Sequence, residues 1–173
     1  DIRFQNALDN DIEILTHADR VLVYDRPIGN EGLTWAALQD WWQQREHLAS
    51  ADEAKKTLYR RLQHCLPRNS PPQQRLFKSY FHAFKSEIPA LPALLPEVWL
   101  HWDPKTVRER GVDALTRFRM DFLMLLPRGI RVVIEVDGKQ HYAGDSGHAD
   151  GARYAAMVVA DRDLKLAGYE VFR

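Results

Sequence analysis

The stretch RFRMDFLMLLPRGIRVVIEVDGKQHY, residues 117–142, contains two runs of β-forming residues on either side of Pro127-Arg128-Gly129. Leu126 and Ile130 are expected to close an antiparallel hairpin around this short turn. Gly129 can supply the positive φ angle that such turns use. The stretch therefore predicts a β-hairpin around which the rest of the chain is organised.

The turn also sets which residues face each other across the hairpin. With Leu126 opposite Ile130, Asp121 lies opposite Glu135, and Arg119 lies opposite Asp137. A shift of one residue would move every side chain to the other face of the sheet. This register is therefore the central assumption of the sequence interpretation.

Strand periodicity divides the hairpin into a charged face and an apolar face. The charged face takes Arg117, Arg119, Asp121, Leu123, Arg131, Val133, Glu135, Asp137 and Lys139. The apolar face, expected to turn inward, takes Phe118, Met120, Phe122, Met124, Val132, Ile134 and Val136.

Carboxylates that face each other across two strands repel, and burial increases that repulsion. A divalent cation would relieve it, because Mg²⁺ is held by one or two carboxylates together with water and phosphate oxygens. The alternative is a structural network in which Arg117, Arg119 and Arg131 neutralise the acids. Periodicity alone does not decide between these two interpretations.

The composition narrows the class of protein. The 173 residues carry 24 Lys and Arg against 24 Asp and Glu, so any basic surface must be local, as it is between Lys105 and Arg119. The single Cys65 excludes an intrachain disulfide and a multi-cysteine zinc site. With no signal peptide and no long apolar run, we expect a soluble cytoplasmic protein without a membrane partner.

The chain reads as a helical front half followed by a mixed α/β part. Helices are expected over residues 2–16, from the N-cap Thr34 to Glu46, over 51–66, over 73–87 and over 152–167, the last ended by Gly168. Residues 88–96 are expected to be an irregular connector, and 98–102 and 169–172 to be strands. The strand at the C-terminus looks cut short, so we expect a longer natural chain.

Two features of the front half admit a functional interpretation. Trp35, Trp41 and Trp42 lie close enough together to stack on nucleobases, although core packing is the favoured explanation. The helix over residues 51–66 also has a basic face, which either meets a phosphate backbone or is simply solvated.

Asp121, followed after the turn by Glu135-Val136-Asp137-Gly138-Lys139, resembles the PD-(D/E)XK nuclease superfamily. In that family an aspartate on one strand precedes an acid, any residue and a lysine on the next. Two alignments stay open, because either Asp137 or Glu135 can be the second acid. The resemblance implies a restriction-endonuclease-like core and an Mg²⁺ ion, with Mn²⁺ as an alternative, bound by Asp121, Glu135 and the carbonyl of Val136.

The wider pattern R-x-D-F, V-x-I-E-V-D-G-x-x-H, D-R-x-L and G-Y-x-V is similar to the very-short-patch-repair endonucleases and related restriction-type proteins. It covers residues 119–171, under a third of the chain. Their cysteine and histidine zinc site is missing, so mismatch recognition is not implied. The helical front half joined to such a core is similar to proteins of bacterial phage-defence systems, in which it would serve for oligomerisation or partner binding.

The remaining site residues follow from this resemblance and, for the nucleic-acid contacts, from the basic residues between Lys105 and Arg119 and in the helix over 152–167. Catalytic roles are expected for Asp121, Glu135, Asp137, Lys139 and His141, and nucleic-acid contacts for Lys105, Arg108, Arg117, Arg119, Arg153 and Arg162. His141 can act as a general acid or base, or be a loop histidine without a role. An ion pair of Asp161 with Arg153 or Arg162 is the structural alternative for those arginines. Glu97 and Glu109 are candidates for an additional upstream acid.

The sequence thus predicts an α+β or α/β protein with a helical region over residues 1–95 and a nuclease-like core over 96–173. The expected activity is Mg²⁺-dependent endonucleolytic hydrolysis of phosphodiester bonds, with DNA as the substrate. One alternative is a non-catalytic nucleic-acid-binding module on the same fold. A second is a protein-interaction domain whose acids form ion pairs.

Overall fold

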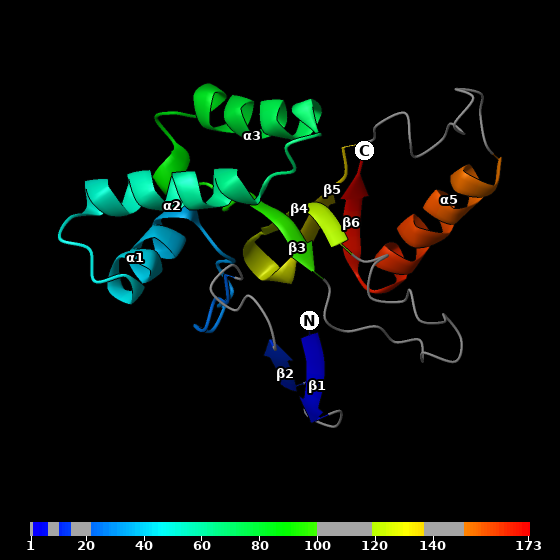
Figure 1. The fold of residues 1–173 in the computed structure, drawn as a ribbon, viewed down its shortest axis with the longest axis horizontal. Helices are drawn as coiled ribbons and strands as arrows, with labels where there is room; N and C mark the ends of the chain where they lie inside the picture. The colour runs from blue at the N-terminus through cyan, green and yellow to red at the C-terminus, as the bar shows by residue number, and fades with distance from the viewer. Residues whose placement is uncertain (1, 7–10, 15–21, 100–118, 137–150) are drawn as a thin grey trace. The chain divides into compact units, whose positions relative to one another are not determined.

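The computed structural model describes residues 2–6, 11–14, 22–99, 119–136 and 151–173 (Figure 1). They fall into two compact units, one containing residues 1–27 and 99–119 and the other residues 28–98 and 120–173. The three helices of the front half share the second unit with the sheet. The division of the chain near residue 95 stays a prediction.

The first unit contains a short hairpin where we expected a helix over residues 2–16. Strands β1 (Ile2–Asn6) and β2 (Asp11–Ile14) pair in antiparallel fashion, with Ile2 opposite Ile14 and Phe4 opposite Ile12. The helix prediction was wrong because apolar residues alternate with polar ones in both segments, which is the period of a strand. The spacing of Phe4, Leu8 and Ile12 imitated a helix across the turn.

The three front-half helices of the second unit begin and end close to where the sequence predicted. They are α1 (Trp35–Arg45), α2 (Ala51–Cys65) and α3 (Pro71–Ala83), followed by the short 3₁₀ helix η2 (Ile88–Ala90). Thr34 and Ser50 accept hydrogen bonds from the backbone N–H groups of Ala37 and Glu53, both at 3.2 Å. These side chains fix the starts of α1 and α2 by satisfying N–H groups that have no partner inside the helix.

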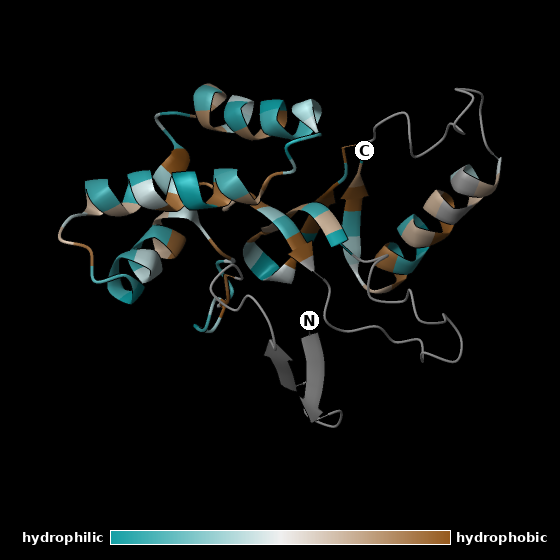
Figure 2. Cartoon of the chain, in the orientation of Figure 1, coloured by the Kyte–Doolittle hydropathy of each residue, from teal (hydrophilic) through white to brown (hydrophobic). Residues whose placement is uncertain are grey.

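The tryptophans of α1 belong to the core. Trp35 and Trp41 are each 2% exposed, and Trp42, at 8%, donates from Nε1 to the hydroxyl of Thr57 in α2 at 3.0 Å. In the described residues they leave no aromatic surface for nucleobases, so the core interpretation is confirmed. Figure 2 shows hydrophilic positions recurring along the outer sides of α2 and α3.

A four-stranded mixed sheet follows, with strand order β3-β4-β5-β6. The strands are β3 (Leu95–Trp99), β4 (Arg119–Leu125), β5 (Arg131–Ile134) and β6 (Tyr169–Phe172). β4 and β5 are antiparallel, whereas β5 and β6 are parallel and are connected through α5 (Gly151–Leu166). The predicted hairpin, helix and returning strand are confirmed, within an α+β protein.

The expected register is also confirmed. Phe122 lies opposite Ile134, Leu123 opposite Val133, and Leu125 opposite Arg131. Leu126 donates its N–H to the carbonyl of Ile130 at 2.8 Å, which closes the turn.

Two consecutive left-handed residues form this turn. Arg128 has a φ of 64°, and Gly129 has a φ of 74°. The positive φ expected at Gly129 is confirmed, and the neighbouring arginine shares it.

Both faces of the hairpin are covered, which the sequence did not predict. Val133, on the face assigned to the charged residues, is 0% exposed, whereas Val132 and Ile134 are only half-buried. On β4, Phe122 and Leu123 point to opposite faces and are both buried. Central strands that pair in parallel are usually buried on both sides, which explains why this apolar run does not alternate strictly.

The segment that precedes α1 connects the helices to the hairpin. Leu33 donates its N–H to the carbonyl of Leu125 at 2.9 Å and accepts from Ala93 at 2.8 Å. Beside it, Gly32 has a φ of 71°, and a Cβ atom there would lie 2.3 Å from the carbonyl oxygen of Leu125. Only glycine fits this close approach of backbone to backbone.

The described helices include none that is long and apolar enough to cross a membrane.

Candidate metal centre at the end of the hairpin

Asp121 lies half-buried near the start of β4, and its carboxylate contacts the opposite strand. Its Oδ2 accepts a hydrogen bond of 2.8 Å from the backbone N–H of Val136. A continued ladder would direct this N–H to the backbone of β4 instead. The side chain of Asp121 therefore replaces the next ladder bond and is held at the point where β5 ends.

The register also fixes the relation of Asp121 to Glu135. Leu126 and Ile130 form a hydrogen-bonded pair, and the pairs alternate from there as far as Phe122 opposite Ile134. Extended by one residue, this register would make Asp121 and Glu135 a non-hydrogen-bonded pair. The N–H of Glu135 accordingly points away from β4 and donates to the carbonyl of Phe172 in β6 at 2.8 Å. In such pairs the Cα atoms are about 4.5 Å apart and the side chains are at their closest.

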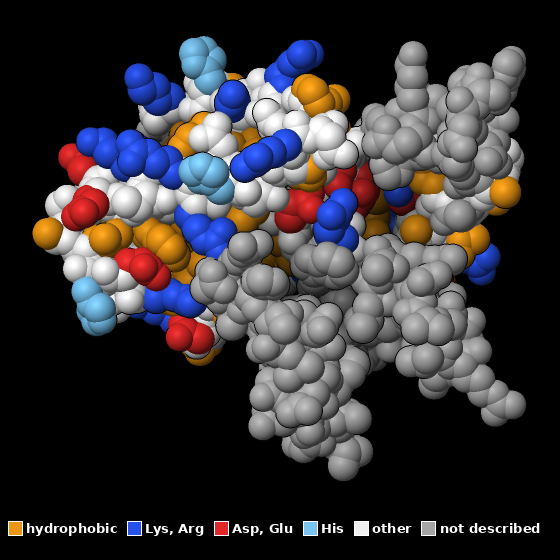
Figure 3. Space-filling model, viewed as in Figure 1, with side chains coloured by type: hydrophobic (Ala, Val, Ile, Leu, Met, Phe, Trp, Pro, Cys, Tyr) orange, Lys and Arg blue, Asp and Glu red, His pale blue; other side chains and the backbone are white. Residues whose placement is uncertain are grey.

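Two half-buried carboxylates thus start from adjacent backbone positions on one face of the sheet. Figure 3 shows acidic side chains gathered over the strand region of the molecule. Carboxylate oxygens are the ligands that Mg²⁺ prefers, and one or two of them suffice when water and phosphate complete the octahedron. The donor set of Asp121 and Glu135 therefore fits a hard divalent cation.

The other predicted ligands and catalytic groups are located as follows. The structure places the N–H of Val136 on Asp121, a contact that sequence reasoning missed because a backbone donor leaves no sequence signal. Asp137, Lys139 and His141 lie outside the described residues. In the described part of the chain, no three His, Cys, Asp or Glu side chains form a group that could hold a metal ion.

The predicted nucleic-acid contacts are only partly described. Arg119 is exposed at the start of β4, and Arg162 is exposed on α5. Arg153 belongs to α5, but its side chain is outside the described part, as are Lys105, Arg108 and Arg117 in full. The structure therefore does not test whether these six residues lie close together.

Arg131, one of the proposed neutralising residues, has another role. Its Nη2 donates to the carbonyl of Ala167 at 2.8 Å, and its guanidinium lies 4.3 Å from the ring centroid of Tyr169. A cation at the C-terminal end of a helix is favourable because the last carbonyls lack partners. Arg131 of β5 thus contacts both the C-terminal end of α5 and the first residue of the neighbouring strand β6.

Asp161 forms an ion pair that the sequence did not predict. It binds the guanidinium of Arg173, with two hydrogen bonds of 3.0 Å to Nε and one of 2.5 Å to Nη2. An ion pair between Asp161 and Arg162 is therefore not the arrangement in this structure. The exposed Arg162 is consistent with a contact to a ligand.

Glu97, the candidate additional acid, lies on β3 with a φ of 55°. Its Oε1 accepts a hydrogen bond of 3.2 Å from Gln73, which is 3% exposed in the first turn of α3. A strained backbone at an acidic residue is a known feature of functional sites. Glu109, the other candidate, lies outside the described residues.

Cys65 lies near the same acid but does not have the properties of a nucleophile. Burial raises the pKa of the Cys65 thiol, and the negative charge of Glu97 raises it further. The positive charge of Arg61 and its hydrogen bond of 3.4 Å to Sγ oppose these effects. Because the thiolate is the reactive form, a raised pKa makes this cysteine unreactive near neutral pH.

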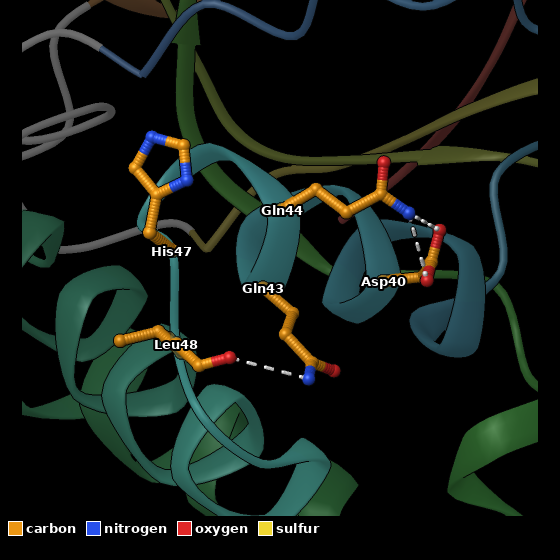
Figure 4. A pocket seen from close by; sticks show the side chains of 5 residues that line it. All are labelled: Asp40, Gln43, Gln44, His47 and Leu48. Atoms are coloured by element: carbon orange, nitrogen blue, oxygen red, sulfur yellow. Dashed lines mark hydrogen bonds between the residues drawn. The ribbon is translucent and has the colours of Figure 1, made fainter.

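A shallow depression at the end of α1 contains none of the predicted residues (Figure 4). It is lined by Asp40, Gln43, Gln44, His47 and Leu48. Their polar groups bind one another, since Gln44 donates to Asp40 and Gln43 donates to the carbonyl of Leu48. This depression therefore has no feature that points to a ligand.

Comparison of the chain with family models, curated proteins and solved structures gave no match, so the candidate site rests on its own residues and geometry.

Proposed function

We propose that this protein is a metal-dependent nuclease that hydrolyses phosphodiester bonds of DNA, with a restriction-endonuclease-like arrangement of its sheet. The observation that supports the proposal is the register of β4 and β5, which extended by one pair would place Asp121 opposite Glu135, together with the hydrogen bond from Val136 to Asp121. An ordinary surface strand pair gains nothing from two facing acids, because like charges opposite each other are unfavourable. A site that binds Mg²⁺ uses that arrangement.

In this proposal Asp121 and Glu135 hold the ion, and Oδ2 of Asp121 is kept in place by the N–H of Val136. When bound, Mg²⁺ neutralises charge at the scissile phosphate and makes its bound water more acidic. Lys139, Asp137 and His141 position the attacking water and exchange protons with it. The exposed Arg119 and Arg162 contact the phosphate backbone.

The proposal is tested with supercoiled plasmid DNA in Mg²⁺, in Mn²⁺ and in EDTA. The wild-type protein is expected to cleave only with the metal, and Asp121→Asn and Glu135→Gln are expected to lower cleavage at least 100-fold. Glu170→Gln is the matched control, because Glu170 is an exposed acid on the neighbouring strand β6. Its cleavage rate should equal that of the wild type.

Wild-type cleavage by Asp121→Asn, with its fold verified by circular dichroism, would refute the assignment of the site. A wild-type protein that binds no Mg²⁺ or Mn²⁺ in calorimetry and cleaves neither DNA nor RNA would favour the non-catalytic alternative.

A further inference from the structure

The charge of the chain is unevenly distributed along its sequence. Residues 54–86 contain eight Lys and Arg and no Asp or Glu, although the whole chain has as many acids as bases. This segment spans most of α2, the connection to α3 and α3 itself. A local excess of this size is the electrostatic signature of a surface that meets a polyanion.

The fold places the bases of α2 opposite its buried face. Ala54, Leu58 and Leu62 of α2 are buried. Lys56, Arg60 and His64 follow one another at intervals of four residues and are exposed. Since positions four apart lie one above the other on a helix, these three side chains form a single outward row.

α3 repeats this arrangement. Gln73 and Phe77 are buried, whereas Arg75, Lys78 and His82 are exposed on the opposite side. Within the described residues, Arg60, Arg75, Lys78 and Lys56 form no ion pair with a carboxylate.

The two rows belong to one surface. Tyr59 of α2 packs against Phe77 and Phe81 of α3, with ring centroids 5.3 Å and 5.0 Å apart. Figure 3 shows Lys, Arg and His side chains over both helices on the same face of the molecule. We call Lys56, Arg60, His64, Arg75, Lys78 and His82 the α2–α3 basic surface.

We propose that the α2–α3 basic surface docks on the phosphate backbone of double-stranded DNA. This inference goes beyond the proposed catalytic site and does not need it, since binding here requires no metal. The surface carries exposed Lys and Arg side chains from both helices, and duplex DNA offers a continuous line of phosphates for such cations to contact.

The same surface fits other polyanions less well. Single-stranded nucleic acid is bound through several exposed aromatic side chains in succession. Here Phe77 is fully buried and Tyr59 and Phe81 pack against it, so the exposed Phe84 at the C-cap of α3 offers a single ring. A membrane-binding helix needs an exposed apolar face for insertion, whereas the described residues of α2 and α3 with their caps offer a single exposed large hydrophobic side chain, Phe84 at the C-cap of α3, which is 42% exposed.

The test compares two variants that lose the same charges. Arg60→Gln/Lys78→Gln removes one cation from each row, and Arg128→Gln/Lys165→Gln removes one arginine and one lysine from exposed positions elsewhere. Glutamine has nearly the helix propensity of arginine and lysine, so the helices should be retained. Binding is measured by fluorescence anisotropy with a labelled 30-base-pair DNA duplex of mixed sequence, in EDTA and over a range of salt concentrations.

Each phosphate contact releases about 0.9 counterion, which corresponds to roughly an eight-fold gain in affinity at 0.1 M salt. Arg60→Gln/Lys78→Gln is therefore expected to lose roughly 10- to 60-fold in affinity and to lower the salt dependence by up to about 1.8 in log–log slope. Arg128→Gln/Lys165→Gln should stay within about two-fold of the wild type.

Equal losses in both variants, or no loss in the first, would overturn the proposal. The proposal would also be overturned if Arg60→Gln/Lys78→Gln lost affinity for duplex RNA or for vesicles of phosphatidylserine but not for DNA. The Asp121→Asn variant, tested alongside, should bind DNA as the wild type does. If the wild type binds DNA through this surface but does not cleave it, the proposed nuclease activity is refuted, whereas the proposed docking surface is not.

Discussion

The carboxylate of Asp121 and the backbone N–H of Val136 are joined by a hydrogen bond of 2.8 Å. One residue thus both offers an acid to the candidate site and satisfies the last N–H of the second strand. The structural and chemical roles of Asp121 can be separated by the choice of substitution.

Asp121→Asn should retain most of the stability of the wild type, because the amide oxygen can still accept the hydrogen bond from Val136. Asp121→Ala removes that acceptor and should lower the free energy of unfolding by about 1–3 kcal/mol. Urea denaturation of both variants measures the difference. Equal stabilities would show that this hydrogen bond contributes nothing measurable.

The loss of stability on replacing each of three glycines by alanine should depend on the backbone geometry at that glycine. Gly32→Ala combines a positive φ with a Cβ position 2.3 Å from the carbonyl oxygen of Leu125, and should cost about 3 kcal/mol or more. Gly129→Ala has a positive φ but open space, and should cost about 1 kcal/mol.

The control is Gly29→Ala, where the space is open and φ is not positive. It should be neutral or slightly stabilising, because alanine restricts the unfolded chain. Chemical denaturation gives all three values, and a mild effect at Gly32 would contradict the close backbone approach described above.

Arg131 should contribute to stability through α5. Arg131→Met retains much of the aliphatic stem but loses the hydrogen bond to Ala167 and the cation over Tyr169, and should cost about 1–2 kcal/mol. Arg128→Met changes the same residue type in the exposed turn and should stay within about 0.5 kcal/mol. Thermal unfolding of the two variants provides the comparison.

The thiol of Cys65 should react slowly with iodoacetamide at neutral pH. Because burial raises its pKa, the alkylation rate should rise at a higher pH than for an unfolded cysteine, whose pKa is about 8.5. Glu97→Gln removes a nearby negative charge and should shift the rate profile to lower pH, whereas Arg61→Gln should shift it higher. Coincident profiles would refute this electrostatic account.

The raised pKa of Cys65 also makes the stability of the folded protein depend on pH. A folded-state pKa above the unfolded value means that the native protein holds the thiol proton more tightly. This contribution is fully present below the unfolded pKa and is lost as the pH rises through the folded one. Cys65→Ser should therefore reduce the loss of stability in alkaline solution.

Local signals accounted for much of the fold. Thr34 is a strong N-cap, Gly129 marks a turn, and both lie at the positions that the sequence indicated. The register of the candidate site followed from the turn alone, because once Leu126 and Ile130 pair, every later pair is fixed.

What the sequence missed depends on tertiary contacts. The burial of Val133 on the face assigned to charged residues requires knowledge of what covers the sheet. The roles of Arg131 at the end of α5 and of Arg173 as the partner of Asp161 join residues far apart in the chain. Periodicity carries no information about such partners, and in the first fourteen residues it imitated a helix where two strands form.

The position of Leu33 has a consequence for dissecting the protein. Leu33 connects the carbonyl of Leu125 to the N–H of Ala93, so the segment that leads into α1 completes hydrogen bonding at the far end of the hairpin. A recombinant fragment that begins at residue 96 would lose this segment and leave the carbonyl oxygen of Leu125 without the N–H of Leu33. Activity measurements should therefore use the chain with its front half in place.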